Sequence, residues 1–157
     1  QYRAIEMQAI GENIQISRLL MIPKSNNKSL GVYSHLGGKI VTLVEITGSN
    51  QEEAIAKAIA MHVAAASPEF LSPEKVSPGI LEHEKEIVKS QIKDKPVNIV
   101  EKIVEGKIKS FYDANCLVCQ KYIRDDSVTV GEFVAMRSKE VGKPLALTHF
   151  IRWNVGQ

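Results

Sequence analysis

The sequence has no long apolar run, few cysteines and almost no net charge. No stretch approaches the roughly 18 to 20 apolar residues that cross a bilayer, and no basic-then-apolar segment opens the chain. Lys and Arg number 20 against 18 Asp and Glu, a formal charge of +2. So small a charge, with both signs alternating along the chain, does not favour direct nucleic-acid or membrane binding. Two cysteines do not make a disulfide framework, so we expect a cytoplasmic protein.

Motifs for nucleotide binding and hydrolysis are absent as well. Neither G-x-G-x-x-G, a phosphate-binding loop nor G-x-S-x-G occurs. Cys116 and Cys119 have C-x-x-C spacing, but zinc needs two further ligands and the four histidines are scattered. A redox pair usually stands at a helix start after a strand, whereas this pair follows a charged helical segment, so buried thiols are the favoured interpretation. We therefore expect no enzyme, metal or cofactor, and a protein that acts by contact.

The composition is that of an ordinary soluble globular protein. Hydrophobic residues make up 44% and charged residues 24% of the 157 positions, enough for one good core. The chain lacks an initiator methionine and opens directly on a helical pattern, QYRAIEMQAI, which ends at Gly11. This opening suggests a piece of a longer protein.

The most strongly patterned stretch is residues 49–67. Ser49 and Glu52 have the spacing of a capping box, and apolar residues then recur at helical intervals until Ser67, which precedes a proline. His62 lies on the apolar face of this predicted helix. Its ring is either satisfied by an acceptor in the core or presented to a partner, and spacing alone does not decide between them.

The fold class predicted is α+β. β-rich runs at residues 14–22, 30–35, 40–46 and 145–154 predict an antiparallel sheet of about four strands with helices on one face, and Gly37-Gly38 predicts a hairpin turn. Residues 122–124 read as extended. Thr129 and Glu132 form a second capping box, which predicts a helix to about residue 141.

Residues 77–111 differ in character from the rest. Narrow apolar stripes in a charged background predict two helices of roughly 15 residues, joined near residues 94–96 and paired as an antiparallel coiled coil. We expect this hairpin to project from the core. Residues 1–74 and 121–157 would then form one continuous α+β core subdomain, with residues 75–120 as an inserted helical hairpin.

Five segments, in order over the whole chain, resemble the bacterial elongation factor Ts family. They are Gly11-Glu12-Asn13-Ile14, the strand around Gly31-Val32-Tyr33-Ser34-His35, Ile59-Ala60-Met61-His62-Val63-Ala64-Ala65, Ile103-Val104-Glu105-Gly106-Lys107, and His149-Phe150-Ile151-Arg152. The resemblance implies a guanine nucleotide exchange factor that accelerates GDP release from the GTPase elongation factor Tu in translation elongation. It covers the family's C-terminal core and its coiled-coil hairpin.

One motif of the family is missing. The resemblance implies an earlier half with a T-D-F-V wedge that acts at the nucleotide site of the GTPase, and no T-D-F-V occurs here. We therefore expect this chain to supply docking and little exchange. A dimerising or structural module is the alternative, because an exposed edge strand can pair with its own copy.

The resemblance also implies partner-binding positions. It favours an interface role for His62, with Met61 beside it, and places Ile123 and Arg124 at a pair that is apolar in a relative. Arg124 would then make a salt bridge or lay its stem on the partner, although a plain exposed arginine is the simpler reading. Tyr122 neighbours this patch. A second, weak contact is implied at the hairpin tip, at Lys93, Asp94 and Lys95.

Overall fold

The computed structural model describes residues 1–92 and 95–156. Its helices are α1 (Tyr2–Ile10), α2 (Glu53–Ala66), α3 (Pro78–Gln91), α4 (Val97–Asn115) and α5 (Val130–Val141). Its strands are β1 (Lys28–His35), β2 (Ile40–Thr47), β3 (Lys121–Tyr122), β4 (Asp125–Thr129) and β5 (Ala146–Asn154), and short 3-10 turns lie at η1 (Leu36–Gly38), η2 (Pro73–Lys75) and η3 (Leu117–Cys119). The mixture of helices with antiparallel sheets confirms the α+β class. None of these helices is long and apolar enough to span a membrane.

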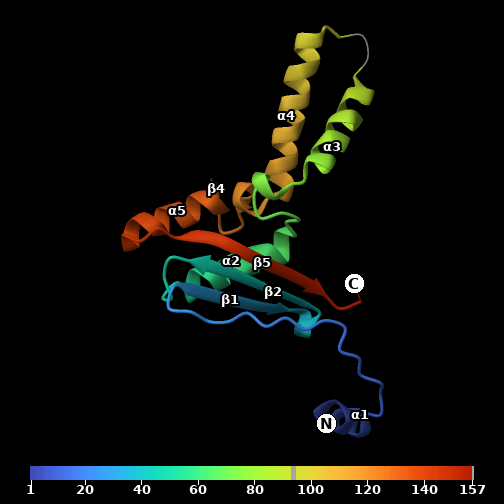
Figure 1. The fold of residues 1–157 in the computed structure, drawn as a ribbon, viewed down its shortest axis with the longest axis vertical. Helices are drawn as coiled ribbons and strands as arrows, with labels where there is room; N and C mark the ends of the chain where they lie inside the picture. Colours follow the sequence, from blue (N-terminus) through green and yellow to red (C-terminus); the bar gives the residue numbers. More distant parts are fainter. Residues whose placement is uncertain (93–94, 157) are drawn as a thin grey trace.

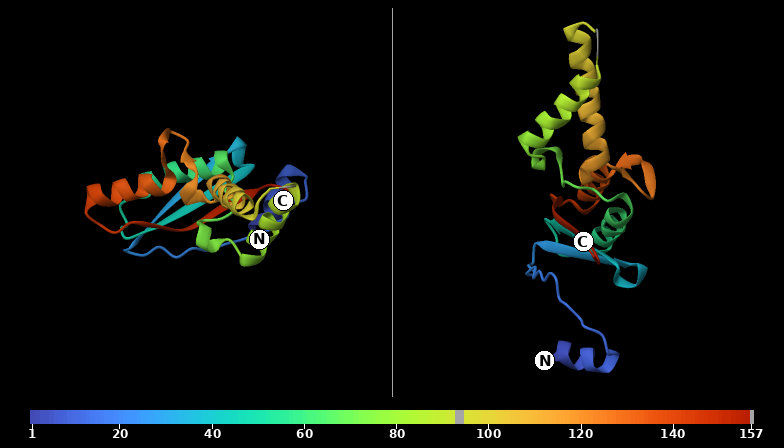
Figure 2. Two further views of the ribbon diagram at one scale, coloured as in Figure 1. Left: turned by 90° about the horizontal axis from the view of Figure 1, so that it is seen from above. Right: turned by 90° about the vertical axis from the view of Figure 1, so that its right-hand side faces the viewer.

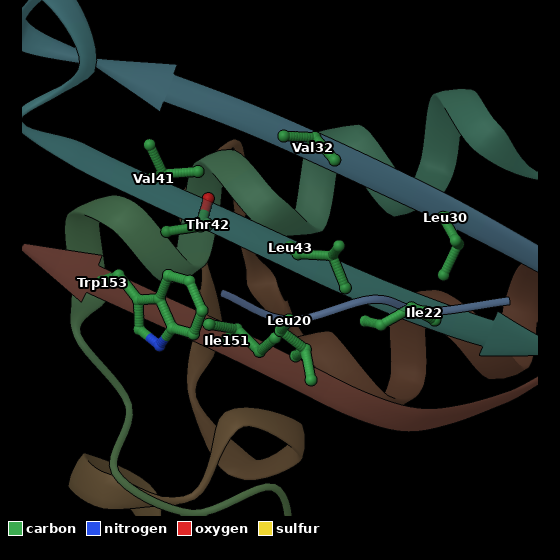
Figure 3. Close-up of a pocket in the computed structure, with 9 residues that line it drawn as sticks. All are labelled: Leu20, Ile22, Leu30, Val32, Val41, Thr42, Leu43, Ile151 and Trp153. Carbon is green, nitrogen blue, oxygen red and sulfur yellow. The ribbon is translucent and has the colours of Figure 1, made fainter. Parts of the chain in front are cut away.

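The main sheet has three strands, in the order β1-β2-β5, and both pairs are antiparallel. The prediction of about four strands in one sheet is wrong, because residues 14–22 form no strand. Instead, this segment is laid across one face of the sheet, where Leu20 and Ile22 meet apolar side chains of all three strands (Figure 3). Leu20 and Ile22 thus pack on the face of the sheet and do not pair at its edge, whereas Ile16, Leu19 and Met21 stay 70%, 84% and 85% exposed.

The other face of the sheet is covered by α2 (Figures 1 and 2). A Cβ atom added at Gly31 would lie 2.1 Å from the backbone carbon of Ala56, so a glycine in β1 is what lets the helix come this close. The core between helix and sheet is fully buried at Val44, Ile46, Ala56, Ile59, Ala60 and Val63. The predicted packing of an apolar-faced helix across antiparallel strands is therefore confirmed.

The start of α2 differs from the prediction. Its N-cap is Glu52, and no side chain caps the helix, so the Ser49–Glu52 capping box is wrong. The Glu52 N–H donates to Ser29 Oγ at 2.8 Å, and the Glu52 carboxylate accepts from Arg137 Nε of α5 at 2.8 Å. Both groups of Glu52 are thus taken by residues from elsewhere in the chain, which ties the start of α2 to β1 and α5.

Other helix ends follow the sequence signals. Thr129 and Glu132 form the predicted capping box at the start of α5. Gly11 and Gly142 follow α1 and α5 in the left-handed conformation, and Ser67 ends α2 with φ 48°. Gly37 and Gly38 also have positive φ and turn the chain from β1 to β2, within the 3-10 turn η1.

Helices α3 and α4 run antiparallel and project away from the sheet (Figures 1 and 2). The antiparallel pair was predicted, but no residue of α3 is buried and in α4 the buried residue is Val104, so its packing does not closely match the predicted coiled coil. After α4 the chain rejoins the core where the Leu117 N–H donates to the Phe70 carbonyl at 2.8 Å. The division into a core and a residue 75–120 insertion stays a prediction.

Residues 121–129 form a second, two-stranded sheet from β3 and β4. The predicted extended segment 122–124 is therefore the end of β3 followed by the turn into β4, with Ile123 and Arg124 at the turn. Tyr122 faces inward and stacks on Phe133 of α5, with ring centroids 4.4 Å apart. This stacking fixes the turn against the core.

Candidate protein-docking site

His62 joins α2 to the turn that follows β3. Its side chain is fully buried, and both ring nitrogens have partners. The Ile123 N–H donates to His62 Nδ1 at 3.2 Å, so Nδ1 carries no proton. Nε2 then carries the proton and donates to Gln120 Oε1 at 2.9 Å. The neutral imidazole is therefore held in one tautomer between two groups of the same loop.

Gln120 is held in turn by backbone carbonyls. Its Nε2 donates to Ala114 O at 2.7 Å and to Ala66 O at 3.4 Å, which directs its Oε1 towards His62. The two carbonyls belong to the last turns of α4 and α2. The polar network thus connects α2, the base of the hairpin and the β3–β4 turn.

Burial keeps His62 neutral. It lowers the pKa of the imidazole below its usual value, because a charged ring would lose its hydration, and the hydrogen bond from Nε2 to Gln120 opposes this only in part. A protonated Nδ1 could not accept from the Ile123 N–H. The geometry at Ile123 therefore depends on the neutral ring.

Above this network lies a shallow apolar groove. Ile123 is 47% exposed, and Nη2 of Arg124 lies 3.4 Å from the sulfur of Met61. We use the name "docking groove" for the surface lined by Tyr33, His35, Met61, Ala64, Ala65 and Ile123, with Arg124 at its rim. An apolar floor with a polar rim is the usual anatomy of a protein interface.

Two side chains of β1 complete the groove. Tyr33 Oη lies 3.0 Å from His35 Nδ1, at hydrogen-bonding distance, and the two rings are 5.9 Å apart. Neither residue was predicted from the sequence to have a binding role. The signal was available, because residues two apart in a strand share a face and β1 was predicted correctly.

The predicted site residues fall in three different environments. Met61, Ile123 and Arg124 meet at the docking groove. His62 and Tyr122 lie beneath it, fully buried and 4% exposed, so their rings do not reach the surface. Lys95 is exposed and lies two residues before the start of α4, in the connection between α3 and α4. Lys93 and Asp94 lie outside the described residues.

No group of three or more His, Cys, Asp and Glu side chains within residues 1–92 and 95–156 is placed to hold a metal ion. What the described residues do form is a small α+β domain with an apolar groove and a buried hydrogen-bond network beneath it.

The comparisons with known proteins give the family. The family model "Elongation factor TS" matches residues 1–157, and the chain therefore belongs to the elongation factor Ts family. An elongation factor Ts of Protochlamydia amoebophila is 66% identical over 157 residues, which are 100% of this chain and 56% of the relative. Those of Chlamydia muridarum and of Chlamydia trachomatis serovar L2 are 46% and 44% identical over 156 residues, 99% of this chain and 55% of each relative. The chain spans about half the length of the curated relatives it matches.

Proposed function

We propose that this chain carries a docking surface of a guanine nucleotide exchange factor for elongation factor Tu, acting in translation elongation in the cytoplasm. Membership of the elongation factor Ts family supports the class of partner, a protein GTPase. The docking groove supports contact as the mode of action. The observation on which the site assignment depends is that a half-exposed Ile123 is held in place from below by the buried ring of His62.

The proposed roles of the residues follow from their positions. Ile123 and Met61 supply apolar contact area, and Arg124 supplies either a charge or a stem laid on the partner. His62 and Tyr122 are assigned as positioning residues, because their rings are buried beneath the surface that they shape. A second, weaker contact at the hairpin tip, at Lys93, Asp94 and Lys95, remains part of the proposal. None of these roles involves covalent chemistry.

The proposed mechanism is linkage. A factor that binds the nucleotide-free GTPase more tightly than the GDP form must weaken GDP binding by the same ratio. Docking through this groove would hold a wedge elsewhere in the same protein at high effective concentration. Because T-D-F-V is absent from these 157 residues, we propose that they bind the GTPase and accelerate GDP release little.

Two measurements on this chain test the proposal. Calorimetric titration into nucleotide-free elongation factor Tu should give saturable binding, and stopped-flow release of a fluorescent GDP should be accelerated little at saturating chain. Absence of binding would contradict the docking role. Full acceleration of GDP release would contradict the separation of docking from the wedge while leaving the docking role in place.

Self-association is a second candidate, favoured by the sheet face opposite α2. On this face Val32 is 52% and Leu20 49% exposed, and β1 and β5 are both edge strands of the described sheet. Exposed apolar area beside free edges is a route to pairing of identical chains. Light scattering after size exclusion distinguishes the two: a stable dimer that dissociates on adding the GTPase would favour this candidate, and a monomer would contradict it.

A further inference from the structure

The two cysteines of the chain meet in one tight turn at the base of the hairpin. Cys116 follows the last residue of α4, and Cys119 ends the 3-10 turn η3. The Cys119 N–H donates to the Cys116 carbonyl at 2.9 Å. A turn closed in this way keeps its terminal Cα atoms within about 7 Å, and a disulfide needs about 4.4 to 6.8 Å.

The two cysteines also occupy paired positions of this turn. Cys116 is the N-cap of η3 and Cys119 its third residue. In a capping box the side chains at these two positions each reach the backbone N–H of the other residue, so the two positions lie on the same side of the turn. Burial raises the pKa of Cys116 to about 11, and negative charge on Cys119, Glu74 and Asp113 acts in the same direction.

The two thiols differ in access to solvent. Cys116 is 0% exposed, whereas Cys119 is partly exposed. A reagent in solution can therefore reach Cys119 and not Cys116. Burial also raises the pKa of Cys119, so both thiols are weak acids. Such thiols attack slowly at neutral pH, but they are poor leaving groups, and the disulfide between them resists reduction.

We propose that Cys116 and Cys119 form a reversible intramolecular disulfide, in which Cys119 reacts first with a low-molecular-weight disulfide such as oxidised glutathione. The Cys119 thiolate attacks one sulfur of oxidised glutathione, forms a mixed disulfide and releases one reduced glutathione. The Cys116 thiolate then attacks Cys119 Sγ and releases the second. The protein loses two protons and two electrons, and the oxidised glutathione gains both.

The cysteine pair lies next to the hydrogen-bond network that holds His62. Gln120 follows Cys119, its N–H donates to the Cys116 carbonyl at 3.1 Å, and its side chain holds His62. The turn therefore lies one residue from the network beneath the docking groove. It is also where α4 is bonded back to the core at Phe70.

The test is a redox titration of the folded chain. The chain is equilibrated in buffers of rising oxidised-to-reduced glutathione ratio, blocked with iodoacetamide and cleaved after lysine. Because Lys109 and Lys121 flank both cysteines, one peptide, residues 110–121, carries the pair. We expect this peptide to lose two hydrogen atoms as the ratio rises, to escape alkylation, and to regain both thiols with dithiothreitol.

Two single variants test the order of the steps. Cys116→Ser should accumulate a glutathione adduct at Cys119, because the resolving thiol is gone. Cys119→Ser should stay unmodified while folded and react only in denaturant, because Cys116 is buried. A folded wild-type chain that shows no internal crosslink, or one that forms it only in denaturant, would overturn the proposal. Equal reactivity of the two variants would overturn the assigned order.

Discussion

The backbone N–H of Ile123 donates a hydrogen bond to Nδ1 of His62, 61 positions earlier in the chain, at 3.2 Å. One partner of this bond is fully buried and the other is half exposed. The bond therefore fixes the backbone of a surface residue to a side chain of the core. Its consequences for binding and for stability can be measured separately.

Ile123→Ala removes apolar surface from the docking groove without opening the core. We expect binding to nucleotide-free elongation factor Tu to weaken by about 1 to 3 kcal/mol, as for a hot-spot residue, while the urea midpoint changes little because the side chain is 47% exposed. Calorimetry gives the first quantity and urea unfolding the second. Met136→Ala, on α5, is the matched control, since Met136 is 52% exposed and does not line the groove. Equal losses in both variants would contradict the location of the site.

His62→Ala should act first on stability. It leaves a cavity and leaves Gln120 Oε1 and the Ile123 N–H without their partner, and an unsatisfied buried group costs about 1 to 3 kcal/mol. Affinity should fall as well, because Ile123 loses its support. Urea unfolding followed by circular dichroism checks the first effect. A variant of unchanged stability that had lost only affinity would show that the ring contacts the partner directly.

The neutral His62 also predicts a pH dependence. The pKa of this ring is lowered in the folded chain, whereas the unfolded chain takes up the proton near the ordinary value of about 6.5. Below about pH 6.5 the unfolded state binds more protons than the folded state, so stability should fall with falling pH until the lowered folded pKa is reached. Above about pH 6.5 the ring is neutral in both states, and protonation of His62 should not affect stability.

The matching variant is His62→Gln, which keeps hydrogen-bonding groups but cannot titrate. The difference in urea midpoint between wild type and variant should shift between about pH 7.5 and about pH 5.5, in favour of the variant at the lower pH. Effects of the other titratable groups cancel in this difference. A constant difference across the range would contradict the lowered pKa of His62.

Gly31→Ala tests the contact between α2 and the sheet. The new Cβ would lie 2.1 Å from the backbone of Ala56 and Lys57, which cannot move without shifting the helix. We expect a loss of about 3 kcal/mol, the upper end of common overpacking effects. Gly79→Ala is the control, because this glycine lies in the first turn of α3 with nothing within 4 Å, and alanine there favours the helix. A tolerated Gly31→Ala would mean that α2 does not pack this closely.

The two capping boxes show where sequence reasoning works and where it fails. Thr129 and Glu132 form the two predicted hydrogen bonds with each other. Ser49 and Glu52 have the same spacing, but Glu52 is bonded by Ser29 and Arg137, which lie 23 and 85 positions away. A local motif is predictable only when no distant residue competes for its groups.

The candidate site was predictable to a similar extent. The resemblance located Ile123 and Arg124, and the periodicity placed His62 on the apolar face of a helix. The His62 ring is hydrogen-bonded to Gln120, which lies 58 positions later in the chain. No local sequence pattern predicts a pairing over this separation. The strand predicted at residues 14–22 failed for a related reason, because an extended apolar segment can pack on a face or pair at an edge.

The order β1-β2-β5 also bears on how the chain folds. Its central strand has one neighbour close by in sequence, while the other is far away, with Thr47 opposite Ala146. The β1–β2 pair and the α3–α4 pair need only short loop closures, whereas joining β5 to β2 closes a loop of about a hundred residues, with a correspondingly larger entropic cost. Docking of β5 is therefore expected to limit the folding rate, and during synthesis one edge of β2 stays open to solvent and to chaperones until the last strand has emerged from the ribosome.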